Sequence, residues 1–360
     1  MPTKTPIRTP AFHRRDVLKS GLLLPPALLA SPSVLAAADL QDKKPKRDKR
    51  QVAMLLPLSG PRAALGLSMR QAALLADSGP EITAYDTGGT AAGAVLAARN
   101  AMKAKAAMIL GPVTAEETSA VAREVAGRVP VVAFSNNAVV RGPGSWVFGI
   151  TPSQVTSAIL RYARSRGIKN VVVIDDASPW SAAAALAAGK VQGEIGIDVR
   201  VLTVTDGQPL PAAGDAPDAV LLPGSGEAVL AAARNLKETG IQLLGTVQAL
   251  DHRPAALDVL SGAWFASPDP AAFGRFAGEY RARHGGDPGA LAALAYDAGG
   301  IVKVLRAKGE IGERALLAET SYTCVTGNAR FRSDGSVARE LAILLAGPEG
   351  YEPVAVSLGA

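Results

Sequence analysis

Residues 109–137 read ILGPVTAEETSAVAREVAGRVPVVAFSNN, and this stretch decides the fold class. One short apolar run ends at Gly111-Pro112, a helical pattern covers 116–126, and a second apolar run fills 129–134. Short apolar runs that alternate with helices, with Gly, Pro or Ser where the runs end, indicate βα units on a parallel sheet. The stretch therefore predicts an α/β protein.

The same alternation continues on both sides of this stretch. Before it, the pattern predicts strands at 52–56 and 82–85 and helices at 63–76 and 91–103. After it, strands are predicted at 171–174, 198–204, 219–222 and 241–244, with helices at 154–165, 181–195, 227–239, 270–284 and 288–308. The tail at 327–353 is predicted to form strands around a turn at Asp334-Gly335. We expect two doubly wound parallel-sheet lobes with a cleft between them, and ligands beyond the carboxyl ends of the strands.

Composition excludes several classes of protein. The chain has 360 residues, of which 48% are hydrophobic, so it can bury sizeable cores and is not generally disordered. Aromatic residues make up 4%, which argues against stacking on nucleic-acid bases. A single cysteine, Cys324, excludes a disulfide framework, and three scattered His argue against a metal site.

The net charge of +6 comes from the N-terminus. Residues 1–50 hold eleven of the 38 Lys and Arg and four of the 32 acids, which leaves 27 basic and 28 acidic side chains from residue 51 onward. The body is therefore close to neutral, and we expect no nucleic-acid partner.

The first 38 residues have the order of an export signal peptide. Residues 13–19 read HRRDVLK, and an apolar run from 21 to 38 ends in three alanines. Arg14 and Arg15 resemble the pair of a twin-arginine export signal, although His13 and Val17 depart from its commonest residues, so general secretion stays open. The alternative, a transmembrane anchor, is weakened by three prolines in a run at the low end of spanning length.

Residues 39–50, DLQDKKPKRDKR, are predicted to form a charged disordered leader. No cysteine precedes Cys324, which excludes a lipid anchor on an N-terminal cysteine. We therefore expect a soluble periplasmic protein without a stable membrane anchor.

Motifs for catalysis are absent from the sequence. There is no GxxxxGK[ST] phosphate loop and no HExxH zinc motif, and residues 223–226 only approach a GxSxG nucleophile turn. Asp175 and Asp176 could hold Mg²⁺ but are better explained as caps of a loop and the following helix. We expect Cys324 to be a packed side chain. The sequence predicts no enzyme, no cofactor and no metal.

Several segments together resemble one family. VAMLLPLSG (52–60), the 84–102 and 109–137 stretches, DAVLLPGSGEAVLAAARNL (218–236), AYDAGG (295–300) and VTGNARF (325–331) resemble, in order and spacing, the type I periplasmic binding proteins. The branch that they resemble is the leucine/isoleucine/valine-binding family. LLGTVQALD (243–251) and the 261–280 stretch are similar to a sub-branch of penicillin-binding protein activators.

The resemblance implies two α/β lobes joined by three crossover strands, near 141–152, 260–268 and 324–330. Lobe 1 would comprise 51–148 and 266–324, and lobe 2 would comprise 149–265 and 325–360. Hinge closure on a ligand would be the mechanism.

The resemblance also supplies a ligand site. Where amino-acid-binding members use a serine for the ligand carboxylate, this chain has Ala115, beside Thr114. Val247 stands where they carry an acid for the ligand ammonium, with Asp251 nearby. A buried ammonium without a partner costs on the order of several kcal/mol, so these two departures argue against a zwitterionic amino acid. The predicted ligand residues are Ser59, Thr114, Ala115, Ser135, Asn136, Asn137, Trp180, Gly224, Gln248 and Asp251.

Structural roles compete for four of these positions. Asn136 and Asn137 could simply form a turn. Trp180 could pack within its own lobe, and Ser59 could cap a helix.

Two functions follow from the resemblance. The first is an exported solute-binding protein that captures a small polar ligand, an amino acid, an amide or a peptide-like molecule, and delivers it to an ABC permease. The second is a regulator on the same fold that contacts a cell-wall synthase. The sequence leaves both open, because fold alone does not settle function.

Overall fold

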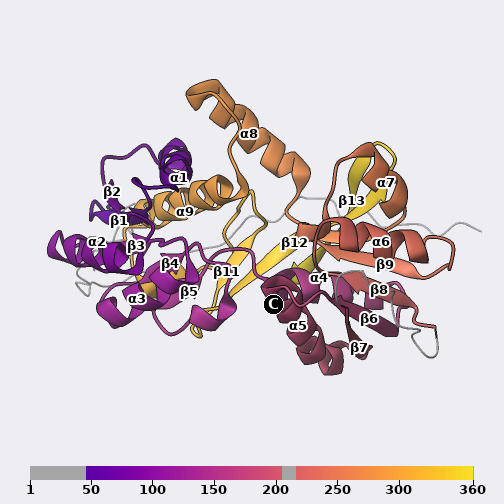
Figure 1. Cartoon of the computed structure of the whole chain (residues 1–360). Coiled ribbons are helices and arrows are strands. Elements are labelled where there is room, and N and C mark those ends of the chain that lie inside the picture. The colour runs from indigo at the N-terminus through magenta and orange to yellow at the C-terminus, as the bar shows by residue number, and fades with distance from the viewer. Residues whose placement is uncertain (1–45, 205–215, 360) are drawn as a thin grey trace, which may run out of the picture. The chain divides into compact units, whose positions relative to one another are not determined.

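A computed structural model of the chain describes residues 46–204 and 216–359 (Figure 1). The predicted signal peptide, with Arg14 and Arg15, lies outside the described residues. Within the described residues, no helix combines the length and the apolar character needed to cross a membrane.

The first sheet is wholly parallel. Its strand order is β2-β1-β3-β4-β5, and each neighbouring pair is parallel. The strands are β1 (Val52–Leu56), β2 (Ile82–Asp86), β3 (Met108–Leu110), β4 (Val131–Ala133) and β5 (Ser145–Val147). The helices between them are α1 (Ala63–Ala76), α2 (Ala91–Lys103) and α3 (Ala115–Val125), followed by the short 3₁₀ helix η1 (Ala138–Val140). Every residue of β1 is buried, as expected for a central strand covered on both faces.

The second sheet is mixed rather than wholly parallel. Its order is β11-β12-β10-β9-β8-β6-β7, with β13 alongside β12. The strands are β6 (Asn170–Asp175), β7 (Asp198–Thr203), β8 (Ala219–Leu222), β9 (Gln242–Thr246), β10 (Trp264–Ser267), β11 (Ala329–Phe331), β12 (Val337–Gly347) and β13 (Gly350–Gly359). The pairs from β7 to β10 are parallel, whereas β12 runs antiparallel to β10, β11 and β13. The predicted doubly wound sheet is therefore correct for β6–β10, and the tail extends it as hairpins.

The remaining helices follow the predicted alternation with some additions. They are α4 (Pro152–Ser165), α5 (Pro179–Ile195), α6 (Glu227–Leu236), η2 (Val247–Ala249), α7 (Pro254–Leu260), α8 (Pro270–His284), α9 (Ala290–Ala307) and α10 (Glu313–Ala318). Helix α4 begins with a capping box, in which Thr151 and Gln154 each bond the other's backbone N–H.

The chain passes three times between the regions of the two sheets. It leaves β5 for α4 through residues 148–151, leaves β10 for α8 through 268–269, and passes from the first core to the second sheet once more through residues 325–340, of which Ala329, Phe331 and Val337 still pack in the first core. Helix α9 lies beside α1 (Figure 1), and Gly299 makes the contact possible, since a Cβ there would lie 2.6 Å from the Ala73 carbonyl oxygen. The three expected crossovers are thus present.

The C-terminal hairpin contributes to the cores on both sides. Ala329, Phe331 and Val337 pack in the cluster that contains β1 and α9, whereas Leu341 and Leu344 pack in clusters of the second sheet. The hairpin formed by β11 and β12 therefore belongs to both hydrophobic cores.

A fully buried arginine joins two of the crossings. The Arg339 guanidinium on β12 donates to the Phe148 carbonyl oxygen at 2.6 Å, and to Thr326 Oγ1 and the Thr326 and Gly327 carbonyls at 2.5–3.3 Å. It also lies 4.8 Å from the centroid of the Phe148 ring. Asp297 accepts three hydrogen bonds from Val325 and Thr326 at the third crossing.

The charged leader predicted over 39–50 ends in an ordered stretch. The N–H of Asp48 donates to the Arg306 carbonyl, and Arg306 donates to the carbonyls of Asp48 and Arg50. The Asp48 carboxylate accepts from the Ile311 N–H at 2.8 Å and from the Arg50 guanidinium. Residues 46–50 are therefore bound along the end of α9.

Candidate functional site

The predicted ligand residues lie where parallel strands end, in two groups. One group follows β1, β3 and β4 of the first sheet: Ser59, Thr114, Ala115, Ser135, Asn136 and Asn137. The other follows β6, β8 and β9 of the second sheet: Trp180, Gly224, Gln248 and Asp251. The contacts join residues within each group, and the cleft between the groups remains a prediction.

Asp86 joins the loops that follow β1 and β2. Its Oδ1 accepts the N–H groups of Leu58, Ser59 and Gly88 at 2.8–3.2 Å. Hydrogen bonding to Ser59 and to the Gly88 N–H lowers the pKa of Asp86 below its ordinary value, so the carboxylate stays charged. Ser59 is exposed and does not cap α1, whose N-cap is Arg62. Its hydroxyl therefore sits in a fixed loop.

The hydroxyl of Thr114 is already engaged in the structure. Thr114 is the N-cap of α3, and its Oγ1 accepts from the Glu117 N–H at 3.2 Å and bonds Glu117 Oε2 at 2.9 Å. Ala115 is the first residue of the helix and offers no polar side chain. Glu117 is almost fully buried, and its Oε1 has no hydrogen-bond partner among the described residues. The predicted site therefore lacks a free hydroxyl here, and it adjoins a buried carboxylate that sequence reasoning missed.

The segment after β4 forms a turn. Ser135 is buried, and its Oγ accepts from the Asn137 N–H at 3.1 Å. The Asn137 side chain in turn accepts from the Val139 N–H at 3.0 Å and caps η1, while Asn136 is exposed. Ser135 and Asn137 thus have local structural partners, which leaves Asn136 as the more available amide.

Thr246 connects three loops of the second sheet. Trp180, at the start of α5, donates from Nε1 to Thr246 Oγ1 at 3.2 Å, and that hydroxyl donates to the Pro223 carbonyl at 2.7 Å. A Cβ at the neighbouring Gly224 would lie 2.2 Å from Asp176 Oδ2, so the loops after β6 and β8 touch there. Trp180 is half-buried and packs against its own core. These contacts fix its ring in place.

Asp251 is paired with a neighbouring arginine. Its carboxylate accepts from the Arg253 guanidinium at 2.6–3.0 Å, and Arg253 also reaches Glu227 at 3.3 Å. The Arg253 guanidinium lowers the pKa of Asp251, so the pair is ionic. Gln248 lies exposed on η2, where Val247 replaces the expected acid. An incoming ammonium would have to compete with Arg253 for the nearest carboxylate.

The remaining chemical candidates have structural roles. Asp175 and Asp176 accept the N–H groups of Ala177 and Ser178, which agrees with their capping the loop, but the N-cap of the following helix is Ser178 and not an aspartate. His252 packs edge-on against Tyr351. Cys324 is buried, and burial raises the pKa of its thiol. Among the described residues, no group of three or more His, Cys, Asp or Glu side chains is arranged to hold a metal ion.

Two α/β sheets joined by three crossings, with polar loops at the ends of their parallel strands, define the class of two-lobed binding proteins. The sequence matches the periplasmic binding protein family over residues 49–344, and the chain belongs to this family. No curated protein matches it by sequence. The suspected type I periplasmic binding protein fold is thereby confirmed.

Solved structures from both suggested branches are similar to this chain in fold. A Rhodospirillum rubrum protein assigned to branched-chain amino acid ABC transport is similar with a TM-score of 0.73 at 21% identity, covering 85% of this chain and 100% of that one. A leucine-, isoleucine-, valine-, threonine- and alanine-binding protein from Brucella ovis gives 0.60 at 17%, covering 86% and 95%. The C-domain of LpoA from Haemophilus influenzae, a regulator of PBP1A, gives 0.68 at 16%, covering 85% and 100%.

Proposed function

We propose that this chain is an exported solute-binding protein of the periplasm, not an enzyme, that captures a small polar ligand without a free ammonium group. An amide or an N-blocked, peptide-like molecule fits this description. Hinge closure between the lobes would enclose the ligand for delivery to an ABC permease. The twin-arginine route remains our proposal for export.

One observation carries the choice of ligand. The acid position after β9 is Val247, and the carboxylate of nearby Asp251 is held by Arg253 at 2.6–3.0 Å. To pair with Asp251, a ligand ammonium would have to displace a bidentate guanidinium, and an ammonium that is buried without a partner costs on the order of several kcal/mol. An amide avoids this cost, since it can bond to neutral groups such as the Asn136 and Gln248 side chains.

The regulator of a cell-wall synthase is the second candidate. Val247 at the acid position and the pairing of Asp251 with Arg253 also favour this second function. A fold that has been reused to contact another protein would not need charged partners for an amino acid. The likeness to the LpoA C-domain supports the comparison at the level of fold. This function would not require a small ligand at all.

Matched ligands test the first proposal. We would measure binding of leucine and of N-acetyl-leucinamide, together with N-acylated dipeptides, by thermal shift and calorimetry. A ligand at a hundred times its dissociation constant adds about 2.7 kcal/mol of stability. We expect the N-blocked compounds to bind and leucine not to bind.

A pair of tryptophan variants locates the site. Trp180→Ala should abolish binding, whereas Trp264→Ala, a change of the same half-buried residue type in β10, should not. Binding of leucine alone would refute the choice of ligand. A flat response to every compound, together with saturable binding to a penicillin-binding glycan synthase, would establish the second function instead.

A further inference from the structure

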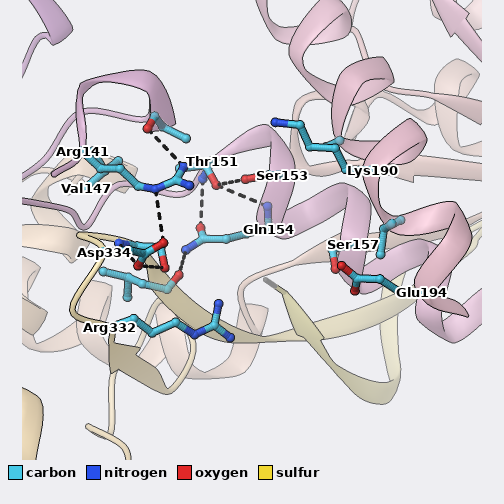
Figure 2. A pocket seen from close by; sticks show the side chains of 15 residues that line it. Arg141, Val147, Thr151, Ser153, Gln154, Ser157, Lys190, Glu194, Arg332 and Asp334 are labelled. Atoms are coloured by element: carbon cyan, nitrogen blue, oxygen red, sulfur yellow. Dashed lines mark hydrogen bonds and ion pairs between the residues drawn. The ribbon is translucent and has the colours of Figure 1, made fainter.

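A second pocket lies at the first crossing, away from the predicted ligand residues. It has a volume of about 300 Å³ and is bounded by α4, α5, the end of the first sheet and the turn at 332–337 (Figure 2). None of the ten predicted ligand residues lines it. The pocket therefore requires its own explanation.

Hydrogen bonds hold the walls of this pocket in place. Gln154 on α4 donates to the Val337 carbonyl at 2.5 Å, and its own side-chain oxygen accepts the Thr151 N–H. The Val147 N–H donates to the Gly335 carbonyl at 3.2 Å. These bonds join α4, the end of the first sheet and the 332–337 turn, and the ion pair between Arg161 and Glu194 joins α5 to α4, so the cavity is part of the folded architecture.

The charges of the pocket leave two cations without a partner. Arg141 pairs with Asp334 at 3.7 Å, and the Glu194 carboxylate pairs with Arg161 at 2.9 Å. Within the part of the chain that the structure describes, neither Lys190 nor Arg332 forms an ion pair, and both line the cavity. The lining holds three cations and two carboxylates, a net charge of +1, and Lys190 and Arg332 are the cations that remain outside the ion pairs.

A buried hydroxyl adds an oriented donor. Ser157 lines the pocket although it is 3% exposed, and its Oγ accepts from Arg161 Nε at 3.3 Å. Among the described residues no acceptor is found for the proton of this hydroxyl, so the proton is available to a ligand oxygen. Figure 2 shows Ser157 on the same side of the cavity as Glu194, with Lys190 projecting toward Ser153.

Beside the charged groups and the polar side chains of Thr151, Ser153, Gln154 and Ser336, the lining includes aliphatic side chains. Its apolar side chains are Ala138, Val147, Ala187, Val191 and Val337. Some walls of the pocket carry cations and hydroxyls, and others carry methyl groups. This arrangement suits a molecule with anionic ends and a hydrocarbon middle. The volume is at the small end of the range for ligand pockets.

We propose that this pocket binds a short aliphatic dicarboxylate, with its carboxylates held by Lys190 and Arg332 and one of them accepting from the Ser157 hydroxyl. None of the predicted ligand residues lines this pocket, so the proposal goes beyond the solute-binding function proposed above. Whether this pocket binds a dicarboxylate does not depend on the outcome of the leucine and amide measurements.

Calorimetry with defined probes tests this site. Succinate, glutarate and adipate are titrated into the purified protein at constant ionic strength, with dimethyl glutarate as the neutral probe and inorganic phosphate as the simple anion. We expect saturable binding of at least one dicarboxylate. Lys190→Met and Arg332→Met should each weaken it at least tenfold, and Lys303→Met, at an exposed lysine of α9 outside the pocket, should leave it unchanged.

Three results would overturn the proposal. They are the absence of saturable binding by all three dicarboxylates, equal binding of phosphate, and unchanged affinity in Lys190→Met and Arg332→Met. Lys190 and Arg332 are both exposed, so neither substitution should disturb the core, and equal melting temperatures of the variants check this.

Discussion

Replacing Arg339 by methionine should destabilise the protein strongly, because its guanidinium connects two crossings from a fully buried position. The change removes the donors that reach Phe148, Thr326 and Gly327 at 2.5–3.3 Å. It also removes the positive charge nearest to Asp297, whose pKa burial already raises. The methionine would leave the acceptors buried and unpaired.

The size of the effect follows from these contacts. Removing one member of a buried, hydrogen-bonded charged group costs about 3–5 kcal/mol, and unpaired acceptors contribute within that range at about 1–3 kcal/mol each. Arg339 Nε has no hydrogen-bond partner within the described part of the chain, so the loss of this buried donor offsets part of the cost. At about 2 °C per kcal/mol, the melting temperature should fall by about 6–10 °C.

Urea denaturation followed by tryptophan fluorescence measures the change in free energy of unfolding. Arg330→Met, at an exposed position on the adjacent strand β11, is the matched control and should change stability by less than about 0.5 kcal/mol. A loss of under about 1 kcal/mol in Arg339→Met, similar to that control, would refute the argument that the guanidinium holds the crossings together.

Three further outcomes are expected. Hydrogen bonds from Arg50 hold the pKa of Asp48 at about 2, so its contribution to stability is complete above about pH 4 and is lost as the pH falls toward 2. Melting curves from about pH 5 down to pH 2.5 should therefore fall less steeply for Asp48→Asn than for the parent, and parallel curves would contradict this. A Cβ at Gly335 would lie 2.5 Å from two backbone oxygens of the 142–145 loop, whereas Gly262 has the same positive φ in open space. By urea denaturation, Gly335→Ala should cost about 1–3 kcal/mol more than Gly262→Ala, and equal costs would mean that the turn can move. Burial raises the pKa of Cys324, so a thiol reagent at about pH 8 should label it slowly in the folded protein and rapidly in urea; fast labelling of the folded protein would show that the thiol is accessible.

The periodic parts of the fold could be predicted from sequence. Helices α1 and α8 have the boundaries that the apolar spacing predicts, because each runs for three turns or more. Strand β5 was missed, since three residues are too few to show alternation. The antiparallel direction of β12 could not be predicted either, because long-range pairing with β10 sets it.

The placement of the candidate ligand residues at strand ends could be predicted, whereas their hydrogen-bond partners could not. The chain order places Ser59 and Asp251 at strand ends, and the structure agrees. The side chain of Thr114 bonds to Glu117, and that of Asp251 bonds to Arg253. Although each partner is within three residues in sequence, these bonds depend on side-chain geometry and could not be predicted. The bond between Trp180 and Thr246 joins residues 66 positions apart, which no local pattern reveals.

The hairpin of β11 and β12 has a consequence for how the protein is made. Because its residues pack in both cores, neither lobe can complete its hydrophobic interior until the last 30 or so residues have left the ribosome. A nascent chain that ends before β11 would expose apolar surface from both sheets at once. Completion of both cores therefore waits for β11 and β12, and removal of these two strands should disturb both sheets rather than one.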